Sequence, residues 1–136
     1  MIMKKTRQFD DIKRGEIIRY LVQPNPYAMR KTKEYWSFGI VSNDYMKNFF
    51  SVITPGGWEG FCFVRIRRDG MDKAGKDAKQ IAFRISPQEI ESNTLIQRFI
   101  EIKKQTEALY KEARHYSEEM KEGKIALFPE YPLPEA

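Results

Sequence analysis

The sequence predicts a mainly β protein with an appended α-helix: a small five-stranded antiparallel barrel followed by a long C-terminal helix. Five short segments between residues 16 and 85 are rich in β-branched and aromatic residues, and turn-forming residues separate them. A strong helix-start signal follows the fifth segment, and a seven-residue apolar repeat follows that signal. The 136 residues suffice for one ordinary domain with a core of its own.

The five predicted strands are each bounded by residues that break a strand. The first follows the turn Lys13-Arg14-Gly15, and a long loop with two prolines separates it from the second. Pro55 and the two glycines after it end the third strand, and a charged loop over residues 68–79 precedes the fifth. In the fourth strand apolar residues alternate, which is typical of a strand with one buried face. The predicted strands are residues 16–22, 36–42, 49–54, 61–67 and 80–85.

Ser86, Pro87 and Glu89 predict the start of a helix. Ser86 can accept a hydrogen bond from the first turn, Pro87 suits the first helical position, and Glu89 completes a capping box. Asn93 either ends a first short helix or is a local irregularity. Helical spacing then continues to about residue 122, and Gly123 suits the C-cap. We therefore expect a β-barrel domain at residues 9–86, a C-terminal helix at 87–123 and a proline-rich tail at 124–136.

Apolar residues recur at alternating spacings of three and four along the predicted helix, as in a coiled coil. Its length of about 43 Å exceeds the diameter of the barrel, which is roughly 30 Å. Either the second half pairs with another chain, giving a homodimer, or the helix breaks or the tail folds back to cover the seam. The residues leave both possibilities open. The seam consists of Leu95, Phe99, Ile102, Thr106, Leu109, Ala113, Tyr116 and Met120.

Basic residues are concentrated in the first part of the chain. The whole chain has 24 Lys and Arg against 19 Asp and Glu, a net charge of +5. Residues 1–80 hold 16 basic and 9 acidic residues, whereas residues 81–136 hold 8 and 10. This distribution predicts an anionic partner for the barrel.

The composition excludes several classes of protein. No stretch approaches about 18 consecutive apolar residues, so we expect no membrane span. No apolar run follows the basic N-terminus, so we expect no secretory signal. Cys62 is the sole cysteine and His115 the sole histidine, which excludes an intramolecular disulfide and a Cys/His zinc set. The expected protein is cytoplasmic and uses neither a metal nor a cofactor.

Two groups of residues predict nucleic-acid binding. The outward face of the fourth strand interleaves aromatic and basic residues, and the loop before the second strand adds more of both. Aromatic rings can stack on bases while arginines neutralise phosphates. The alternative is that the helix covers the aromatic residues and that the basic ones are merely solvated. The predicted nucleic-acid-binding residues are Lys31, Lys33, Tyr35, Phe61, Phe63, Arg65, Arg67 and Arg68.

Three segments resemble the PemK/MazF-like toxins, which are small dimeric barrels related to the SH3 shape. Lys13-Arg14-Gly15-Glu16-Ile17-Ile18 resembles the family's opening strand, Phe-Gly-Ile-Val-Ser-Asn-Asp at residues 38–44 its buried strand, and Asn48-Phe49-Phe50-Ser51 the stretch that follows. The resemblance covers about residues 13–66. It implies an SH3-like barrel and a metal-independent ribonuclease, in which the ribose 2′-hydroxyl of single-stranded RNA attacks its own phosphate. It also implies an antitoxin as partner.

The catalytic positions of that family carry other residues here. Its Arg-Pro pair falls on Trp36 and Ser37, and its threonine falls near Arg67. In the family an arginine after the first long loop acts on the phosphate, and a threonine or serine assists. If the chain is active, we expect displaced substitutes, Arg30 and Thr54, to take these catalytic roles, with Arg65 and Arg67 of the fourth strand holding the RNA.

The sequence leaves two main functions open, one of them enzymatic. The first is an RNA-binding MazF-like barrel protein that acts as a metal-independent endoribonuclease toxin if the displaced residues are active. The alternative is a non-catalytic inhibitor from a phage or mobile element, which binds a nuclease or another nucleic-acid-binding protein complex. The displaced catalytic positions, the heptad helix and the apolar tail favour this alternative. A dimeric nucleic-acid-binding regulator without catalysis is a third interpretation.

Overall fold

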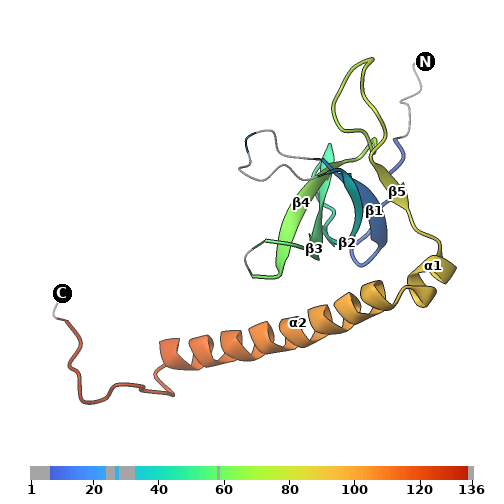
Figure 1. Cartoon of the computed structure of the whole chain (residues 1–136). Coiled ribbons are helices and arrows are strands. Elements are labelled where there is room, and N and C mark those ends of the chain that lie inside the picture. The colour runs from blue at the N-terminus through green and yellow to red at the C-terminus, as the bar shows by residue number, and fades with distance from the viewer. Residues whose placement is uncertain (1–6, 24–26, 28–32, 58, 135–136) are drawn as a thin grey trace. The chain divides into compact units, whose positions relative to one another are not determined.

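The computed structural model describes residues 7–23, 27, 33–57 and 59–134. The chain divides into two compact units, Met1–Asn93 and Thr94–Ala136, which we describe separately. The first unit contains all the strands and a short helix, and the second contains a long helix and the C-terminal tail (Figure 1).

One antiparallel sheet of five strands, in the order β4-β3-β2-β1-β5, forms the first unit (Figure 1). Consecutive strands from β1 to β4 are neighbours in the sheet, as is usual for strands that follow one another in the sequence. The mainly β class and the five antiparallel strands are thus confirmed. The strands are β1 (Ile17–Val22), β2 (Tyr35–Asn43), β3 (Phe49–Pro55), β4 (Phe61–Arg67) and β5 (Ala82–Arg84).

The sheet is open, unlike the closed barrel that the sequence predicted. Its edge strands are β4 and β5, and within the described residues they do not pair with each other. β5 has only three residues and pairs with β1 alone. The chain between β4 and β5 is instead joined to itself by an isolated bridge from Met71 to Gln80. The N–H of Ala82 in β5 donates to the carbonyl of Gly70 at 3.1 Å, so the loop before β5, and not β4, supplies a further partner to this edge strand.

One face of the sheet carries the hydrophobic core. The segment before β1 covers it with Phe9, which is fully buried and whose ring centre lies 5.3 Å from that of Phe50. Each large apolar side chain that is buried in this way contributes about 1.5–3 kcal/mol to stability. The core consists of Phe9, Ile12, Ile18, Tyr20, Val41, Phe50, Val52, Ile66 and Ala82.

Gly39 lets β2 lie close against its neighbour on the core face. A Cβ atom at this position would be 2.5 Å from Cγ2 of Val52, closer than two carbon atoms can approach. Any larger residue would therefore push the two strands apart. This close approach explains a glycine in the middle of an otherwise apolar, β-branched strand.

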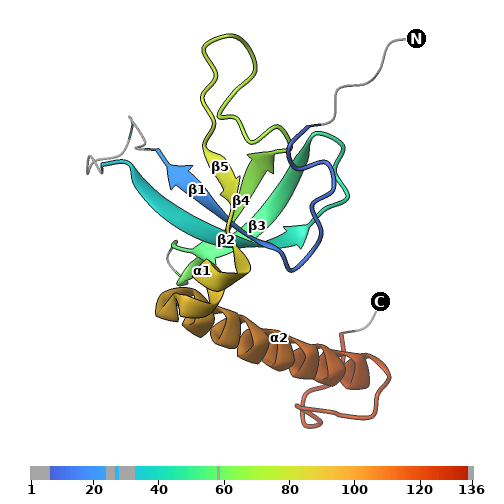
Figure 2. The ribbon, with the colours of Figure 1, turned by 90° about the vertical axis from the view of Figure 1, so that its right-hand side faces the viewer.

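The opposite face of the sheet is also largely apolar, with arginines among the apolar residues. The strand register pairs Arg19 of β1 with Phe38 of β2, which lies between β1 and β3 (Figure 2). Phe38 and Ile40 are buried, whereas Trp36 is 51% and Phe63 is 64% exposed. This face therefore has a buried strip along β2 and exposed aromatic side chains beyond it.

Two helices follow the sheet, α1 (Pro87–Ser92) and α2 (Thr94–Lys121). The hydroxyl of Ser86 accepts a hydrogen bond from the N–H of Glu89 at 3.3 Å, as the capping pattern predicts. Asn93 is extended, with φ −91° and ψ 106°, so it ends α1 and separates the two helices. Of the two readings of Asn93, the end of a first short helix is confirmed.

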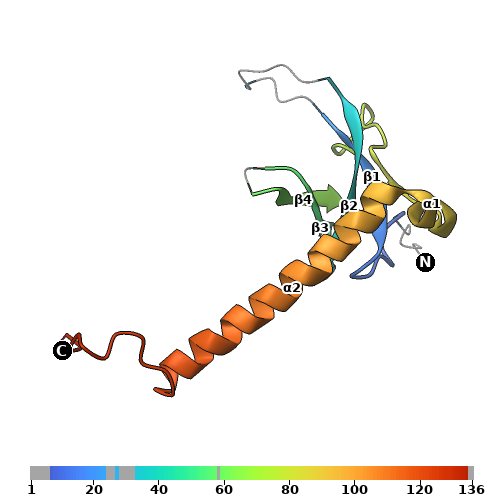
Figure 3. The same ribbon diagram turned by 60° about the horizontal axis from the view of Figure 1, so that its bottom comes forward.

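α2 is a single uninterrupted helix of 28 residues (Figure 3). Gly123, with φ 78°, ends it in a Schellman arrangement. The N–H of Gly123 donates to the carbonyl of Met120 at 3.2 Å, and that of Lys124 donates to the carbonyl of Glu119 at 2.9 Å. Within the described residues, no helix is long and apolar enough to cross a bilayer.

Candidate nucleic-acid interface

Arg19 of β1 lies between two aromatic rings. Its guanidinium carbon is 4.9 Å from the ring centre of Trp36 and 4.7 Å from that of Phe83. The two rings meet edge to face, with centroids 5.7 Å apart. Trp36 belongs to β2 and Phe83 to β5, the two neighbours of β1, so three adjacent strands build this group. We call Arg19, Trp36 and Phe83 the Arg19 cluster.

The register of the strands builds the Arg19 cluster. Pairing places Phe83 directly opposite Arg19 and places Trp36 opposite Leu21, two positions further along β1. Diagonal neighbours at this spacing are within reach of aromatic and long side chains. A guanidinium over a ring is stabilised by about 0.5–1 kcal/mol at an exposed site. The two rings therefore help to orient Arg19.

The Arg19 cluster is accessible to a ligand. Trp36 keeps 51% of its surface exposed, and Arg19 is exposed as well. No carboxylate within the described part of the chain forms an ion pair with Arg19. The positive charge of Arg19 is thus available to an anion at the point where an exposed indole ring offers a stacking surface.

A second aromatic and basic group lies on the same face, at β3 and β4. The guanidinium carbon of Arg65 is 5.4 Å from the ring centre of Phe49, and the rings of Phe61 and Phe63 meet edge to face at 6.3 Å. Phe63 is 64% exposed, and Arg65 is exposed. The predicted outward face of the fourth strand thus brings Phe61, Phe63 and Arg65 together. We call Phe49, Phe61, Phe63 and Arg65 the Arg65 cluster.

The strands contain arginines but no acidic residue. They include Arg19, Arg65, Arg67 and Arg84, and neither Asp nor Glu. Arg84 is paired with two carboxylates that precede β1. Residues 1–93 carry 17 Lys and Arg against 11 Asp and Glu, whereas residues 94–136 carry 7 against 8. The first unit is therefore the one that attracts an anionic ligand.

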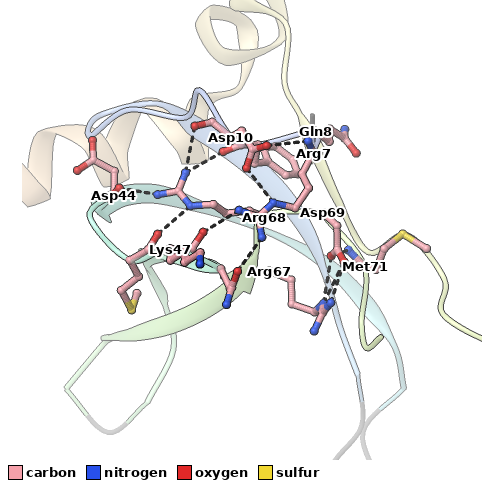
Figure 4. Close-up of polar contacts among 12 residues, drawn as sticks. Arg7, Gln8, Asp10, Asp44, Lys47, Arg67, Arg68, Asp69 and Met71 are labelled. Carbon is pink, nitrogen blue, oxygen red and sulfur yellow. Dashed lines mark hydrogen bonds and ion pairs between the residues drawn. The ribbon is translucent and has the colours of Figure 1, made fainter. Parts of the chain in front are cut away.

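Arg67 is paired with a carboxylate of its own turn. Its Nη2 atom is 2.8 Å from Oδ2 of Asp69, and its Nε–H donates to the same carboxylate (Figure 4). The hydrogen bond from Arg67 holds the pKa of Asp69 below its ordinary value, and the same bond raises the pKa of Arg67. Asp69 also accepts the N–H of Met71 at 2.9 Å. Arg67 therefore stabilises the turn after β4, and part of its charge is neutralised.

Arg68 is buried and joins three segments of the chain (Figure 4). All three of its side-chain nitrogens donate to backbone carbonyl groups: Nε to Met46 at 2.9 Å, Nη1 to Phe9 at 3.0 Å and Asp10 at 3.4 Å, and Nη2 to Asp44 at 2.5 Å. Only 7% of Arg68 is exposed. The RNA-binding role predicted for Arg68 does not fit this placement. We call Arg68 and these four carbonyl groups the Arg68 hub.

The side chain of Arg68 points to the opposite face from that of Arg67 because Arg68 directly follows the last residue of β4. Successive side chains of a strand alternate in direction, so Arg67 and Arg68 cannot share a face. The backbone of Arg68 is fixed as well: its carbonyl accepts the N–H of Phe9 at 2.8 Å, and its N–H donates to the carbonyl of Asn48 at 3.0 Å. Any residue can supply a backbone carbonyl group, so no sequence pattern predicts which carbonyl groups accept from Arg68.

Thr54 is fully buried among other hydroxyl groups. Its hydroxyl donates to the carbonyl of Phe38 at 2.7 Å, accepts the hydroxyl of Tyr20 at 3.0 Å, and lies 3.4 Å from Oγ of Ser37. Burial raises the pKa of Tyr20, although the hydrogen bonds with Thr54 and Ser37 act in the opposite direction. The catalytic role predicted for Thr54 does not fit, because its hydroxyl has no exposed surface and is already hydrogen-bonded.

The loop residues predicted to bind or cleave RNA are only partly described. Arg30 and Lys31 lie outside the described residues. Lys33 is exposed, and Tyr35 at the start of β2 is 54% exposed. Because side chains alternate along a strand, Tyr35 points to the opposite face from Trp36. Tyr35 therefore does not join the Arg19 cluster.

The Arg19 cluster was missed in the sequence. Neither Arg19 nor Phe83 was predicted to bind a ligand, and Trp36 was noted only as a position where the PemK/MazF-like toxins have their Arg-Pro pair. One signal was present: Arg19 interrupts an otherwise apolar strand, between Ile18 and Tyr20, which are both buried. An arginine at such an outward position requires partners, and flat rings on the neighbouring strands supply them.

Comparison with known proteins adds no family to this picture. No protein-family model, curated protein or solved structure matches the chain significantly. In the part of the chain that the structure describes, no three His, Cys, Asp or Glu side chains are grouped so that they could hold a metal ion. The chemistry of the two clusters therefore carries the functional assignment.

Proposed function

We propose that the first unit binds single-stranded RNA on the sheet face that carries the Arg19 and Arg65 clusters. The observation that carries this proposal is the exposed guanidinium of Arg19, which lies between Trp36 and Phe83 without a carboxylate partner among the described residues. Such a group offers a cation and a ring at one point, which matches a phosphate followed by a base.

A single strand fits these clusters better than a duplex does. The base of an unpaired nucleotide can leave its neighbours and stack on an aromatic side chain, whereas the bases of a duplex are already stacked on one another. Stacking of one base on one ring contributes about 1–3 kcal/mol and depends little on the sequence. Two clusters on one face would hold two stretches of the same strand, with the arginines on its phosphates.

RNA rather than DNA is proposed from the resemblance to the PemK/MazF-like toxins over residues 13–66. Their single-stranded RNA substrate belongs to the proposal, but their cleavage reaction does not. Thr54, which was to assist the reaction, is buried and hydrogen-bonded. RNA binding, without a catalytic role for Thr54, is therefore the function that the site supports best.

The test is fluorescence anisotropy with a labelled, mixed-sequence single-stranded RNA in EDTA. Trp36→Ala and Arg19→Gln should each weaken binding by about tenfold, since each removes a stacking ring or a phosphate contact. Arg114→Gln is the matched control, because it removes an exposed arginine from α2; it should change the affinity less than twofold. Arg19→Gln should also reduce the slope of log K against log salt by about 0.7.

Three outcomes separate the candidate functions. Equal affinity of the wild type and both folded cluster variants would overturn the proposed site. Failure of the wild type to bind RNA would favour the alternative of an inhibitor that binds a protein. Denaturing gels of the same samples should show intact RNA. Cleavage to 2′,3′-cyclic phosphate ends in EDTA would instead restore the toxin interpretation.

A further inference from the structure

The heptad seam of α2 is exposed along most of its length. Leu95 keeps 66% and Leu109 keeps 64% of its surface exposed, while Tyr116 keeps 49% and Ile102 and Met120 keep 42% each. A row of large apolar side chains at heptad spacing over more than three heptads is the pattern of a coiled-coil strand. An exposed apolar row of this kind marks an interaction surface.

We propose that α2 pairs with α2 of a second copy of this chain in an antiparallel coiled coil. The proposal concerns the second unit and is independent of RNA binding by the first. A two-fold axis requires that the same surface complement itself, because each residue contact occurs twice with the partners exchanged. The sequence of α2 meets this requirement in two ways, in its apolar layers and in its flanking charges.

One antiparallel alignment pairs every seam position with another seam position. The seam positions are symmetric about a point between Glu107 and Ala108. When the second helix runs in the opposite direction, each seam position therefore lies opposite another seam position. The layer of Phe99 with Tyr116 is not counted, because Phe99 is only 9% exposed. The remaining layers join Leu95 with Met120, Ile102 with Ala113, and Thr106 with Leu109 of the second copy, and each occurs twice.

The charges beside the seam favour the antiparallel direction. In this alignment Arg98 lies beside Glu119 of the second copy, and the two-fold axis repeats the pair. In a parallel coiled coil Arg98 would instead lie beside Lys103 of the second copy, so that two cations meet. Arg98 is 3.0 Å from Glu101 of its own helix, but both side chains are 60% exposed, and a surface pair of this kind exchanges partners at little cost.

The other flanking positions contain no like-charged pair in the antiparallel alignment. Those on one side of the seam bring Gln105 beside Glu112 of the second copy. Those on the other side bring Lys103 beside Tyr110. The complete antiparallel interface thus has two attractive ion pairs and no repulsive one, which selects a second copy of α2 as the partner and fixes its direction.

Sedimentation equilibrium of the full chain tests whether α2 carries the dimer. The wild type should have twice the chain mass of 16.1 kDa. Leu109→Lys should give a monomer, because it places two ammonium groups in the central layers. The matched control is Leu133→Lys, which makes the same change at a tail residue that is 90% exposed, and it should remain a dimer.

Charge reversal tests the direction of pairing and leaves the apolar seam intact. Arg98→Glu should raise the dimer dissociation constant by about three- to tenfold, because two Glu–Glu contacts replace two ion pairs. Glu119→Arg should do the same, and the double variant Arg98→Glu with Glu119→Arg should restore the wild-type constant. In a parallel coiled coil Arg98→Glu would face Lys103, so it would tighten the dimer.

Several results would overturn the proposal. The first is a wild type that is monomeric at about 100 µM, which would mean that α2 is covered by its own tail or not at all. The second is a dimer that Leu109→Lys and Leu133→Lys affect equally. A tighter dimer with Arg98→Glu would overturn the antiparallel direction. If Leu109→Lys lowers the helical circular dichroism of the monomer, the substitution has unfolded α2. The charge-reversal variants then decide whether α2 forms the dimer. RNA binding by a wild-type monomer would remove this proposal and leave the proposed function intact.

Discussion

The Arg68 hub and the Arg19 cluster hold the same kind of side chain in opposite ways. In the hub, carbonyl groups accept from all three side-chain nitrogens, and the arginine is 7% exposed. In the cluster, an exposed guanidinium contacts two aromatic rings. Carbonyl groups fix an arginine by occupying its donors, whereas rings fix it and leave the donors free. The hub can therefore only hold the fold together, and the cluster can bind a ligand.

The comparison predicts that one substitution has very different effects at the two sites. Arg68→Met should lower the free energy of unfolding by about 2–4 kcal/mol, because it leaves four carbonyl groups in the hub without their charged donor. Urea denaturation followed by circular dichroism measures this loss. Arg114→Met on the exposed surface of α2 is the control and should stay within about 0.5 kcal/mol of the wild type. A loss below about 1 kcal/mol would show that water replaces the arginine in the hub.

A smaller effect is expected at Asp69, which pairs with the neighbour of Arg68. Arg67 lowers the pKa of Asp69 in the folded protein, so the folded state binds a proton there less readily than the unfolded state does. The stabilisation is complete above the ordinary pKa near 4, and it is lost as the pH falls through the lowered value. At pH 6 Asp69→Asn should cost up to about 1 kcal/mol.

That cost should shrink as the pH falls from 6 toward 2, because the wild-type carboxyl group takes up a proton as the pH falls through its lowered pKa. Urea denaturation at the two pH values measures the difference. Glu101→Gln is the control, since this glutamate belongs to an exposed pair on α2. A cost at Asp69 that does not change with pH would mean that the carboxylate stabilises the turn by its shape rather than by its charge.

The smallest effect on stability is expected at the Arg19 cluster. Arg19→Met keeps an unbranched side chain between the two rings and leaves no buried acceptor unpaired, so the free energy of unfolding should change by less than about 1 kcal/mol. The same variant should bind RNA about tenfold more weakly. Loss of both stability and binding would assign Arg19 to the fold, and the contrast with Arg68 would disappear.

The features that local sequence determines were predictable. Four of the five strands lie within one residue of their predicted bounds, because alternation and turn residues are visible in the sequence. Ser86 and Gly123 cap the helices as predicted, because capping depends on a few adjacent residues. The Arg65 cluster was also accessible, since three of its members alternate along one strand.

The features that depend on distant segments were not predictable. The fifth strand is three residues long instead of six, and its pairing with β1 alone leaves the sheet open. Arg68 was assigned to RNA although backbone carbonyls from two other segments enclose it. The Arg19 cluster combines residues from three strands, and only the register of those strands brings them together. Sequence patterns predict on which face of the sheet a side chain lies, but not which side chains of other segments contact it there.

The Arg68 hub also determines the order in which the chain can fold during its synthesis. Its acceptors at Phe9 and Asp10 lie 59 and 58 residues before Arg68, so these two carbonyl groups cannot bond Arg68 until β4 has been made. At about 5–20 residues per second this delay lasts roughly 3–12 s. Phe9, which is fully buried in the finished sheet unit, has its ring partner Phe50 before that point, but its carbonyl group gains a charged donor only with Arg68. The segment before β1 thus completes its contacts only after β4, whereas α2 depends on local contacts and can form as it emerges.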